Sequence, residues 1–329
     1  MKRRRAIALF AALTLLTVGC GDDTGKKITR NEAGIVGVKF DGPAIKVSRR
    51  PVAITSGGGG IWVASMGGGV VTKIDPATNR KVGKPIKTGN APYSLDYAFG
   101  RVWVAAFDSD RLFRIDPATR KVEGRPIKVP NRPFGMDEGF GRMWVTSIRN
   151  ASVSAVDPET GKVDGKPIPV PGVPYGLTTG GGYVWVVNIR DDEVTRIDPK
   201  TREVVGKPIK VGDLPGAIAY GAGKIWVANA KDVLPNAKHG TITRIDARSG
   251  KVVGPSIKVP IRPQAIAAND RDVWVVSIDG DTLLHIDART GKRDKRPVLI
   301  GNAPADVTID SSGVWTANTK DDTVSRFRP

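Results

Sequence analysis

The feature that most constrains this chain is a tryptophan motif that recurs along almost its whole length. Residues 225–229 (Ile-Trp-Val-Ala-Asn) form one copy around Trp226. Successive tryptophans lie 41 residues apart, except for one interval of 48 residues, and close relatives of the motif surround all the others: Trp62, Trp103, Trp144, Trp185, Trp274 and Trp315. A fixed period in the forties, with one hydrophobic strand per unit, is typical of β-propeller blades.

Each unit contains four predicted strands, and the second unit shows them clearly. Residues 92–97, 101–106 and 112–115 are the first three strands, and residues 126–129 end the fourth. The turn at 116–119 (Asp-Pro-Ala-Thr) has an Asp that can cap its own backbone and a Pro that presets φ for a type I turn. Four short antiparallel strands in each of seven units predict an all-β, seven-bladed β-propeller.

The two ends of the repeat region are complementary. The last unit stops after its third strand, and residues 43–51 match residues 125–133, which contain a fourth strand. We therefore expect residues 44–47 to complete the seventh blade and so close the ring without a free sheet edge. The expected organisation is a signal peptide at 1–20, a polar tether at 21–42 and the propeller at 43–329.

The first 20 residues are typical of an export signal. Lys2–Arg5 are basic, residues 6–16 are apolar, and the apolar run is too short for a membrane span. Cys20 is the only cysteine, and the segment before it resembles a bacterial lipobox, although Thr17 stands where Leu, Val or Ile is usual. The alternative is a plain secretion signal with an incidental Cys. We expect an exported monomer, held by a lipid on Cys20 at the outer face of the cytoplasmic membrane or at the outer membrane.

The repeat also resembles a known family. The cores at 226–229 (Trp-Val-Ala-Asn) and 185–188 (Trp-Val-Val-Asn), the Arg-Ile-Asp-Pro turn and the Gly-Lys-Pro-Ile-Lys-Val strand look like YVTN-type propeller repeats. The resemblance covers about residues 43–329. It implies a propeller architecture but no particular activity, because propellers serve as enzymes, binding modules and scaffolds.

The chain is strongly basic, with a formal net charge of +18. One interpretation is an anionic partner such as nucleic acid or another charged polymer. The other is structural: many Lys and Arg residues lie on the predicted outermost strands, where they discourage edge-to-edge association. Charge spread evenly around a rim makes a poor groove for a polymer, so we favour the structural interpretation.

The loops between fourth and first strands and between second and third strands should share one face of the ring. Binding sites favour loops held by a rigid scaffold. The seven-residue insertion within residues 231–240 falls on this face too. The partner expected here is a protein, a glycan or a small molecule, and the candidate binding residues are Arg50, Tyr93, Asp108, Arg132, Phe134, Arg149, Tyr175, Arg190, Asp191, Lys231, His239, Arg262, Asp279 and Asp321.

Two sets of residues on the first strands bear on the central channel. Tyr93, Phe134 and Tyr175 begin three successive first strands and form either an aromatic arc at the channel mouth or a packing layer between blades, which their strand parity favours. Asp96, Asp137 and Asp306 are predicted to line the channel. They lack the dense spacing of a calcium loop, so no metal or cofactor is expected.

Catalytic signals are weak. His239 and His285 have no obvious carboxylate or metal-ligand partner nearby in the sequence. The repeat plan is similar to that of streptogramin (virginiamycin B) lyases, carbon–oxygen lyases that open a cyclic depsipeptide with a His, a Glu and Mg²⁺. The Trp motifs here run into Ala-Asn or Val-Asn in place of the Thr-Glu of those enzymes, and no matching His/Glu pair is present. We expect a non-catalytic binding or scaffold module; His285 is the only candidate catalytic residue if the chain is an enzyme.

Overall fold

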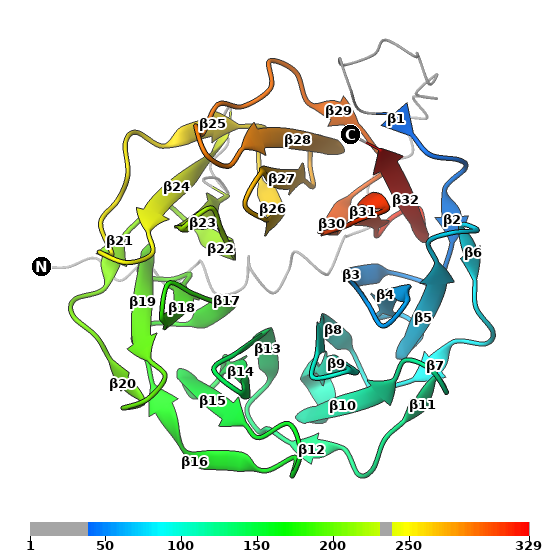
Figure 1. Cartoon of the computed structure of the whole chain (residues 1–329), viewed down its shortest axis with the longest axis horizontal. Helices are drawn as coiled ribbons and strands as arrows, with labels where there is room; N and C mark the ends of the chain where they lie inside the picture. The colour runs from blue at the N-terminus through cyan, green and yellow to red at the C-terminus, as the bar shows by residue number, and fades with distance from the viewer. Residues whose placement is uncertain (1–38, 231–238, 329) are drawn as a thin grey trace, which may run out of the picture.

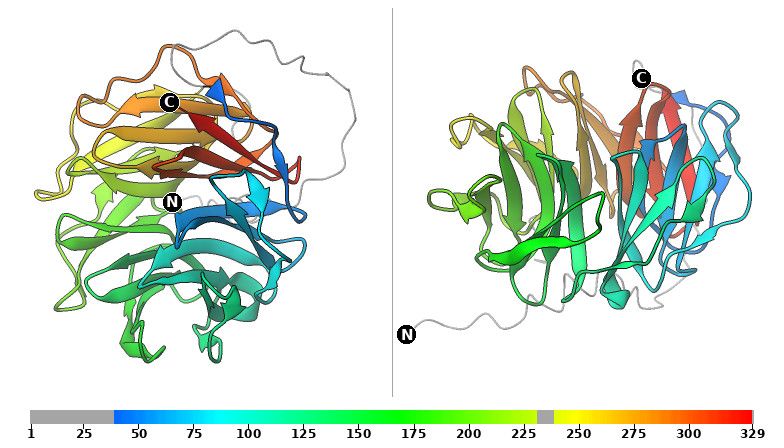
Figure 2. Two further views of the ribbon diagram at one scale, coloured as in Figure 1. Left: turned by 45° about the vertical axis from the view of Figure 1, so that its right-hand side comes forward. Right: turned by 60° about the horizontal axis from the view of Figure 1, so that its bottom comes forward.

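The computed structural model describes residues 39–230 and 239–328, which form seven antiparallel sheets arranged in a ring (Figure 1). The side views in Figure 2 show the sheets standing next to one another around the axis of the ring. The predicted seven-bladed β-propeller is therefore confirmed. Within the described ranges the single helical element is the short 3-10 helix η1 (Phe107–Ser109), and no helix there is long and apolar enough to cross a membrane.

Each blade starts with an inner strand at the axis and continues outward. The inner strands are β3 (Pro51–Gly57), β8 (Pro92–Ala98), β13 (Pro133–Gly139), β17 (Pro174–Gly180), β22 (Pro215–Gly221), β26 (Pro263–Ala268) and β30 (Pro304–Asp310). The second strands, which carry the tryptophans, are β4 (Gly60–Ser65), β9 (Arg101–Ala106), β14 (Arg142–Ser147), β18 (Tyr183–Asn188), β23 (Lys224–Asn229), β27 (Asp272–Ser277) and β31 (Gly313–Asn318).

The third strands lie further from the axis, and the outer strands are short. The third strands are β5 (Val70–Asp75), β10 (Arg111–Asp116), β15 (Ser152–Val156), β19 (Glu193–Asp198), β24 (Gly240–Asp246), β28 (Thr282–Asp287) and β32 (Thr323–Arg328). The outer strands are β6 (Arg80–Lys81), β7 (Ile86–Lys87), β11 (Lys121–Val122), β12 (Ile127–Lys128), β16 (Val163–Pro169), β20 (Glu203–Val204), β21 (Ile209–Lys210), β25 (Ile257–Val259), β29 (Val298–Leu299), β1 (Lys39–Phe40) and β2 (Ile45–Lys46).

Seven hydrophobic clusters of the core lie one at each junction between neighbouring blades, and an eighth, smaller cluster surrounds Phe107 and Phe134. Every tryptophan is almost fully buried and belongs to the cluster that its blade shares with the next one. In five blades the indole Nε1–H donates to a carbonyl oxygen five residues earlier, as Trp103 does to Ala98 at 3.1 Å. The repeated tryptophan therefore supplies both the interblade core and a hydrogen bond that fixes the turn after the inner strand.

The turn between third and outer strands has the predicted mechanism. Asp116 accepts hydrogen bonds from the Ala118 N–H at 2.8 Å and from the Thr119 hydroxyl at 2.8 Å. The outer strand that follows is divided into two short pieces in three blades, as β11 and β12 show, and the outer strand of blade 7, which comes from the N-terminal segment, is divided into β1 and β2. Between these two pieces Gly124 has φ of 60° and Pro126 lacks an N–H group, so the outer edge presents little continuous backbone for a foreign strand.

The ring closes as the sequence predicts, and the closing segment is longer than expected. β2 pairs with β32 in the register Ile45↔Val324, which confirms that residues 44–47 complete blade 7. β1 also pairs with β32, through Lys39↔Arg328 and Phe40↔Phe327. Residues 39–40, which the sequence analysis assigns to the polar tether, are therefore part of the propeller.

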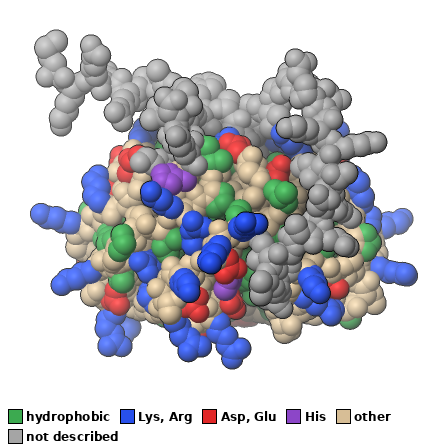
Figure 3. Space-filling model, turned by 90° about the horizontal axis from the view of Figure 1, so that it is seen from above, with side chains coloured by type: hydrophobic (Ala, Val, Ile, Leu, Met, Phe, Trp, Pro, Cys, Tyr) green, Lys and Arg blue, Asp and Glu red, His purple; other side chains and the backbone are tan. Residues whose placement is uncertain are grey.

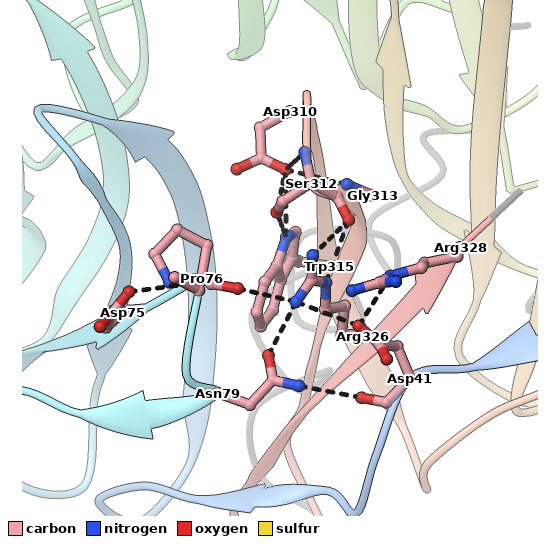
Figure 4. A network of polar contacts seen from close by, with 11 residues as sticks. Asp41, Asp75, Pro76, Asn79, Asp310, Ser312, Gly313, Trp315, Arg326 and Arg328 are labelled. Atoms are coloured by element: carbon pink, nitrogen blue, oxygen red, sulfur yellow. Dashed lines mark hydrogen bonds and ion pairs between the residues drawn. The ribbon is translucent and has the colours of Figure 1, made fainter.

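One buried arginine connects the three segments that meet at this junction (Figure 4). Arg326 on β32 donates to the Pro76 carbonyl oxygen in blade 1 at 2.7 Å and to the Ser312 carbonyl oxygen in blade 7. Its guanidinium is 3.0 Å from the Asp41 carboxylate in the closing segment. The same guanidinium lies over the Trp315 ring, 5.0 Å from its centroid. The residue thus ties the N-terminal segment and the first blade to the last one.

Candidate functional site

A cavity of about 270 Å³ opens on the axis of the ring, at the end where the inner strands begin. We call this end the loop-rich face, because the loops between outer and inner strands and between second and third strands lie there. The opposite end, with the tight turns, is the turn face. All seven inner strands contribute to the cavity wall, each through residues directly after its first proline.

An irregularity in the backbone of every inner strand turns the side chains of these residues toward the axis. All seven pairings of inner and second strands change register after the first proline, as between Pro92 and Ser94. A β-bulge lets two adjacent residues face the same side of a strand. Consequently Tyr93, Ser94 and Leu95 all line the cavity, and simple alternation does not describe this part of the strand.

The three aromatic residues predicted at the channel mouth lie together in the cavity wall. The ring centroids of Tyr93 and Phe134 are 4.3 Å apart, and those of Phe134 and Tyr175 are 4.0 Å apart. Phe107 packs behind them, 6.0 Å from Phe134. The structure therefore combines the two alternatives of the sequence analysis, because the rings pack against one another and also border the cavity.

Among the described residues that line the cavity, Asp306 has the one charged side chain. Its Oδ2 accepts a hydrogen bond from the Ile54 N–H at 2.8 Å, and its Oδ1 accepts one from the Val307 N–H at 2.9 Å. Burial raises the pKa of this carboxyl to about 7, and the two backbone hydrogen bonds lower it by a smaller amount. The side chain is thus held in place, with lone pairs on both oxygens left for a ligand.

Asp96 and Asp137 face the axis further from the loop-rich face. They lie opposite Trp103 and Trp144 in their sheets, whereas Asp306 lies opposite Ala317, closer to the start of its strand. Burial raises the pKa of Asp137 to about 6. Burial and then the neighbouring Asp137 charge raise the pKa of Asp96 well above its usual value. The three predicted channel carboxylates therefore face the axis, and Asp306 differs from the other two because it alone borders the cavity.

Several acidic residues on the loop-rich face have a structural role that the sequence does not reveal. The N–H of the residue before an inner strand donates to an Asp in the preceding blade, as Ala303 does to Asp281 at 2.7 Å. The same bond joins Arg50 to Asp322, Arg132 to Asp110 and Leu214 to Asp192. These carboxylates fix where the cavity-lining segments of blades 1, 3, 5 and 7 begin. Each of these aspartates directly precedes a third strand, and this repeated position is the sequence signal that identifies them.

Other predicted binding residues form ion pairs at the loop-rich face. Arg132 lies 3.7 Å from Asp108 and also over the Phe107 ring, at 4.8 Å. Arg262 donates to both carboxylate oxygens of Asp279 at 2.8 Å. These contacts orient guanidinium groups around the cavity mouth.

The remaining described candidates lie in loops of the loop-rich face, outside the cavity lining. Asp321 accepts hydrogen bonds from Asn302, and the carbonyl oxygen of Asp191 accepts one from Lys210. Arg149 and Arg190 are exposed, and His239 is half-buried. Lys231 lies outside the described residues. The structure thus places most of the predicted binding residues on one face; their participation in binding stays a prediction.

His285 has the carboxylate partners that the sequence analysis did not find. Its Nε2 is 3.0 Å from Asp272 and its Nδ1 is 3.5 Å from Asp294. These partners are 13 and 9 positions away in the chain, so strand pairing brings them to the imidazole and sequence proximity does not reveal them. This cluster lies on the turn face, away from the cavity.

Comparison with other blades explains what His285 replaces. Other blades have a cationic side chain at the position of His285, among them Lys73, Arg114 and Arg326. Each of these three lies over the tryptophan of its own blade. Each also donates a hydrogen bond to the carbonyl oxygen of the Pro in the third-to-outer turn of the next blade. The ring of His285 lies 4.7 Å from Trp274, but its next blade takes its outer strand from β1 and β2 and has no such turn in the described residues.

On the turn face, an open cleft of about 870 Å³ lies between blades 6 and 7. At other junctions the third-to-outer turn of the next blade occupies this place. Trp274 lines the cleft, and the buried Nε1 of this indole has no hydrogen-bond partner within the described part of the chain. Sequence reasoning missed this cleft, because it results from the different route by which blade 7 obtains its outer strand.

Comparisons with known proteins identify the fold class. No family model and no curated protein matches the chain. Among solved structures, a streptogramin B lyase aligns with a TM-score of 0.74 and 17% identity over 89% of this chain and 98% of its own. A selenomethionine-substituted virginiamycin B lyase from Staphylococcus aureus has a TM-score of 0.74 and 18% identity over 89% and 99%. Hydrazine synthase of Kuenenia stuttgartiensis has a TM-score of 0.74 and 16% identity over 88% and 99%.

This chain is therefore a seven-bladed β-propeller similar in fold to proteins of different activities. Identities of this size establish the fold alone. The YVTN-type resemblance and the lipoprotein signal stay predictions. In the described ranges no group of three or more His, Cys, Asp or Glu side chains is arranged to hold a metal ion.

Proposed function

We propose that this protein is a non-catalytic binding module whose ligand enters the cavity at the loop-rich face. The observation that carries the proposal is the cavity itself, because all seven blades build its wall and an aromatic arc covers one side of it. A largely apolar pocket with a few convergent polar groups is the usual form of a small-molecule site. The ion pairs around its mouth add polar groups that can select the ligand.

The test compares two glycine substitutions. An added Cβ at Gly216, which lines the cavity, has only one atom of Tyr175 within 4 Å, at 4.0 Å, so Gly216→Leu fills the cavity with little strain. Gly280 lies on the same face outside the cavity, and a Cβ there meets nothing closer than 3.4 Å. A panel of small molecules, glycans, heparin and DNA is screened for a rise in melting temperature, which a ligand that binds only the native state produces.

A small molecule that stabilises the wild type and Gly280→Leu but not Gly216→Leu would support the proposal. A ligand that stabilises all three equally would place binding elsewhere. Stabilisation by heparin or DNA alone, lost at high salt, would favour an anionic-polymer partner instead. Figure 3 shows Lys and Arg side chains spread over the side of the ring among acidic ones, a distribution that provides no single basic groove in this view.

We further propose that the module works outside the cytoplasm, anchored through Cys20. The sequence supports this through the basic Lys2–Arg5, the apolar run at 6–16 and the cysteine that follows it. A Cys20→Ser variant should move from the membrane fraction to the soluble exported fraction. An unchanged distribution would contradict the lipid anchor.

A second candidate is an enzyme, and the fold shared with lyases is what favours it. A further solved structure with this fold, a catalytically inactive virginiamycin B lyase from Staphylococcus aureus, was determined with quinupristin, so this compound is the one to test. His285 is the candidate catalytic residue, but it lies on the turn face and its partners are aspartates. Opening of the quinupristin ring by the wild type, with loss in His285→Ala, would support a lyase and overturn the non-catalytic proposal.

A further inference from the structure

The wall of the cavity is strongly asymmetric. At the second residue of the inner strand, blades 2, 3 and 4 carry Tyr93, Phe134 and Tyr175. The other blades carry smaller side chains at this position, which are Val52, Gly216, Gln264 and Ala305. One half of the cavity is therefore an aromatic surface, and the other half leaves room for a ligand to lie against it.

The next position along the same strands carries the single charge. Blades 1 to 6 have small uncharged residues there, including Ala53, Ser94 and Gly176, whereas blade 7 has Asp306. A carboxylate in such surroundings is unfavourable to folding unless a partner compensates its charge. Its partners in the described part of the chain are two backbone N–H groups, and no Lys, Arg or His is among the described residues that line the cavity with it.

We infer that this cavity binds a small organic ammonium ion with an aromatic body, the ammonium at Asp306 and the ring against Tyr93, Phe134 and Tyr175. The inference rests on the proposed function and names the class of ligand. Aromatic faces attract cations as well as apolar rings, so both parts of such a ligand gain from this wall. A protein cavity of about 150 Å³ accommodates benzene, so about 270 Å³ has room for one ring and a short amine chain.

Other ligand classes fit these residues less well. An inorganic cation such as Ca²⁺ takes 6–8 oxygen ligands, and Asp306 is one carboxylate in a mostly apolar wall. An anion would meet a carboxylate and, among the described lining residues, no cationic side chain. Burial raises the pKa of Tyr93, the hydrogen bond with Tyr175 lowers it, and the charges of Asp306 and Arg50 raise and lower it in turn. Arg50 is not among the described residues that line the cavity.

The expected pH dependence follows from the charge of Asp306. The carboxyl titrates at about 7, so a cationic ligand must compete with a proton at lower pH. Tyr93 and Tyr175 face the same cavity, but burial raises the pKa of both, so they stay neutral from pH 5.5 to 8. The affinity for an ammonium ligand should therefore fall about tenfold per pH unit below 7.

The experiment is calorimetric titration of the full chain with 2-phenylethylamine, its neutral analogue 2-phenylethanol and the anion phenylacetate. We expect the amine to bind at pH 8 at least about tenfold more tightly than the alcohol, and Asp306→Asn to abolish that difference. Gly216→Leu should remove binding, and Gly280→Leu should retain it. Circular dichroism and melting temperature establish that each variant is folded.

The possible failures are distinguishable. Equal binding of amine and alcohol, an unchanged affinity in Asp306→Asn, or no loss between pH 8 and 5.5 would overturn the ammonium assignment. If the alcohol or phenylacetate binds best and Gly216→Leu removes that binding, the ligand class is wrong but the cavity still functions as proposed. If none of the three ligands binds to the wild type, the assignment of an aromatic ammonium ligand is overturned; the broader panel with the two glycine variants then decides whether the cavity is a binding site.

Discussion

Arg326 in blade 7 donates a 2.7 Å hydrogen bond to the carbonyl oxygen of Pro76 in blade 1, across the junction where the ring closes. The same side chain is 7% exposed and pairs with Asp41 from the closing segment. A buried charge without its partner lowers the stability of the folded protein, so the Arg326 guanidinium depends on the Asp41 carboxylate that pairs with it. The junction is therefore held by a polar network as well as by the hydrophobic cluster around Trp315.

Removal of the Arg326 side chain should destabilise the whole propeller. We expect Arg326→Ala to lower the free energy of unfolding by about 3–5 kcal/mol, because the Pro76 and Ser312 carbonyl oxygens lose their buried donor and Asp41 keeps only the exposed Arg328 as a partner. Arg328 also pairs with Asp41 at 3.0 Å but is 64% exposed, so Arg328→Ala should cost less than about 1 kcal/mol. Urea unfolding measures both, and equal losses would show that burial of Arg326 is unimportant.

Deletion of residues 43–48 should also destabilise the ring, because it removes β2 and exposes the edge of β32. We expect a lower melting temperature and a tendency to associate through the open edge. Light scattering and thermal unfolding measure the two effects. An unchanged melting temperature would mean that β1 alone is enough to close blade 7.

The architecture was predictable because its signals are local and repeated. The spacing of Trp62 to Trp315 determines the number of blades, and the match between residues 43–51 and 125–133 indicates the closing strand. Each blade must bury the same hydrophobic face against its neighbour, so the period in sequence becomes the period in space. Only the start of the closing segment, at Lys39, was missed.

The site was less predictable because it depends on departures from the repeat. Alternation along a strand places Tyr93 with Leu95, but the bulge after Pro92 aims both residues and Ser94 at the cavity. A bulge has no reliable sequence signal. Asp306 was likewise grouped with Asp96 and Asp137, because its position at the cavity follows from its register opposite Ala317.

Two carboxylates on one loop offer a test of the bonds between blades. Asp281 accepts the Ala303 N–H at 2.7 Å and fixes the start of β30, whereas Asp279 pairs with Arg262 at a more exposed place. We expect Asp281→Ala to cost about 1–3 kcal/mol of stability and Asp279→Ala less than about 1 kcal/mol. Chemical unfolding of the two variants measures the difference; similar values would contradict the structural role of Asp281.

His285 should act on stability and not on ligand binding in the cavity. His285→Ala removes the ring packed on Trp274 and leaves Asp272 and Asp294 close together, so we expect a loss of about 1–2 kcal/mol. His285→Arg restores the cation found in this position in other blades and should recover most of that stability. A loss of cavity binding in His285→Arg, with the fold intact, would contradict the separation of the two ends.

Asp306 should make the propeller less stable as the pH rises. Burial raises the pKa of its carboxyl in the folded protein to about 7, above the value of about 3.9 for an unfolded chain. The folded state then binds more protons than the unfolded state between these values, so its stability falls as the pH rises from about 4 to 7. Burial also raises the pKa values of Asp96 and Asp137, so these residues contribute in the same direction.

Asp306→Asn removes the charge and keeps the shape, and its one amide oxygen can accept one of the two N–H groups, of Ile54 and Val307, that the carboxylate accepts. At pH 8 we expect the variant to be more stable than the wild type by on the order of 2 kcal/mol, and at pH 4 the two should differ little. Urea unfolding at both pH values provides the measurement. A difference between variant and wild type that does not grow with pH would show that Asp306 is charged in the folded protein throughout this range, and that its burial in the cavity wall has little effect on its ionisation.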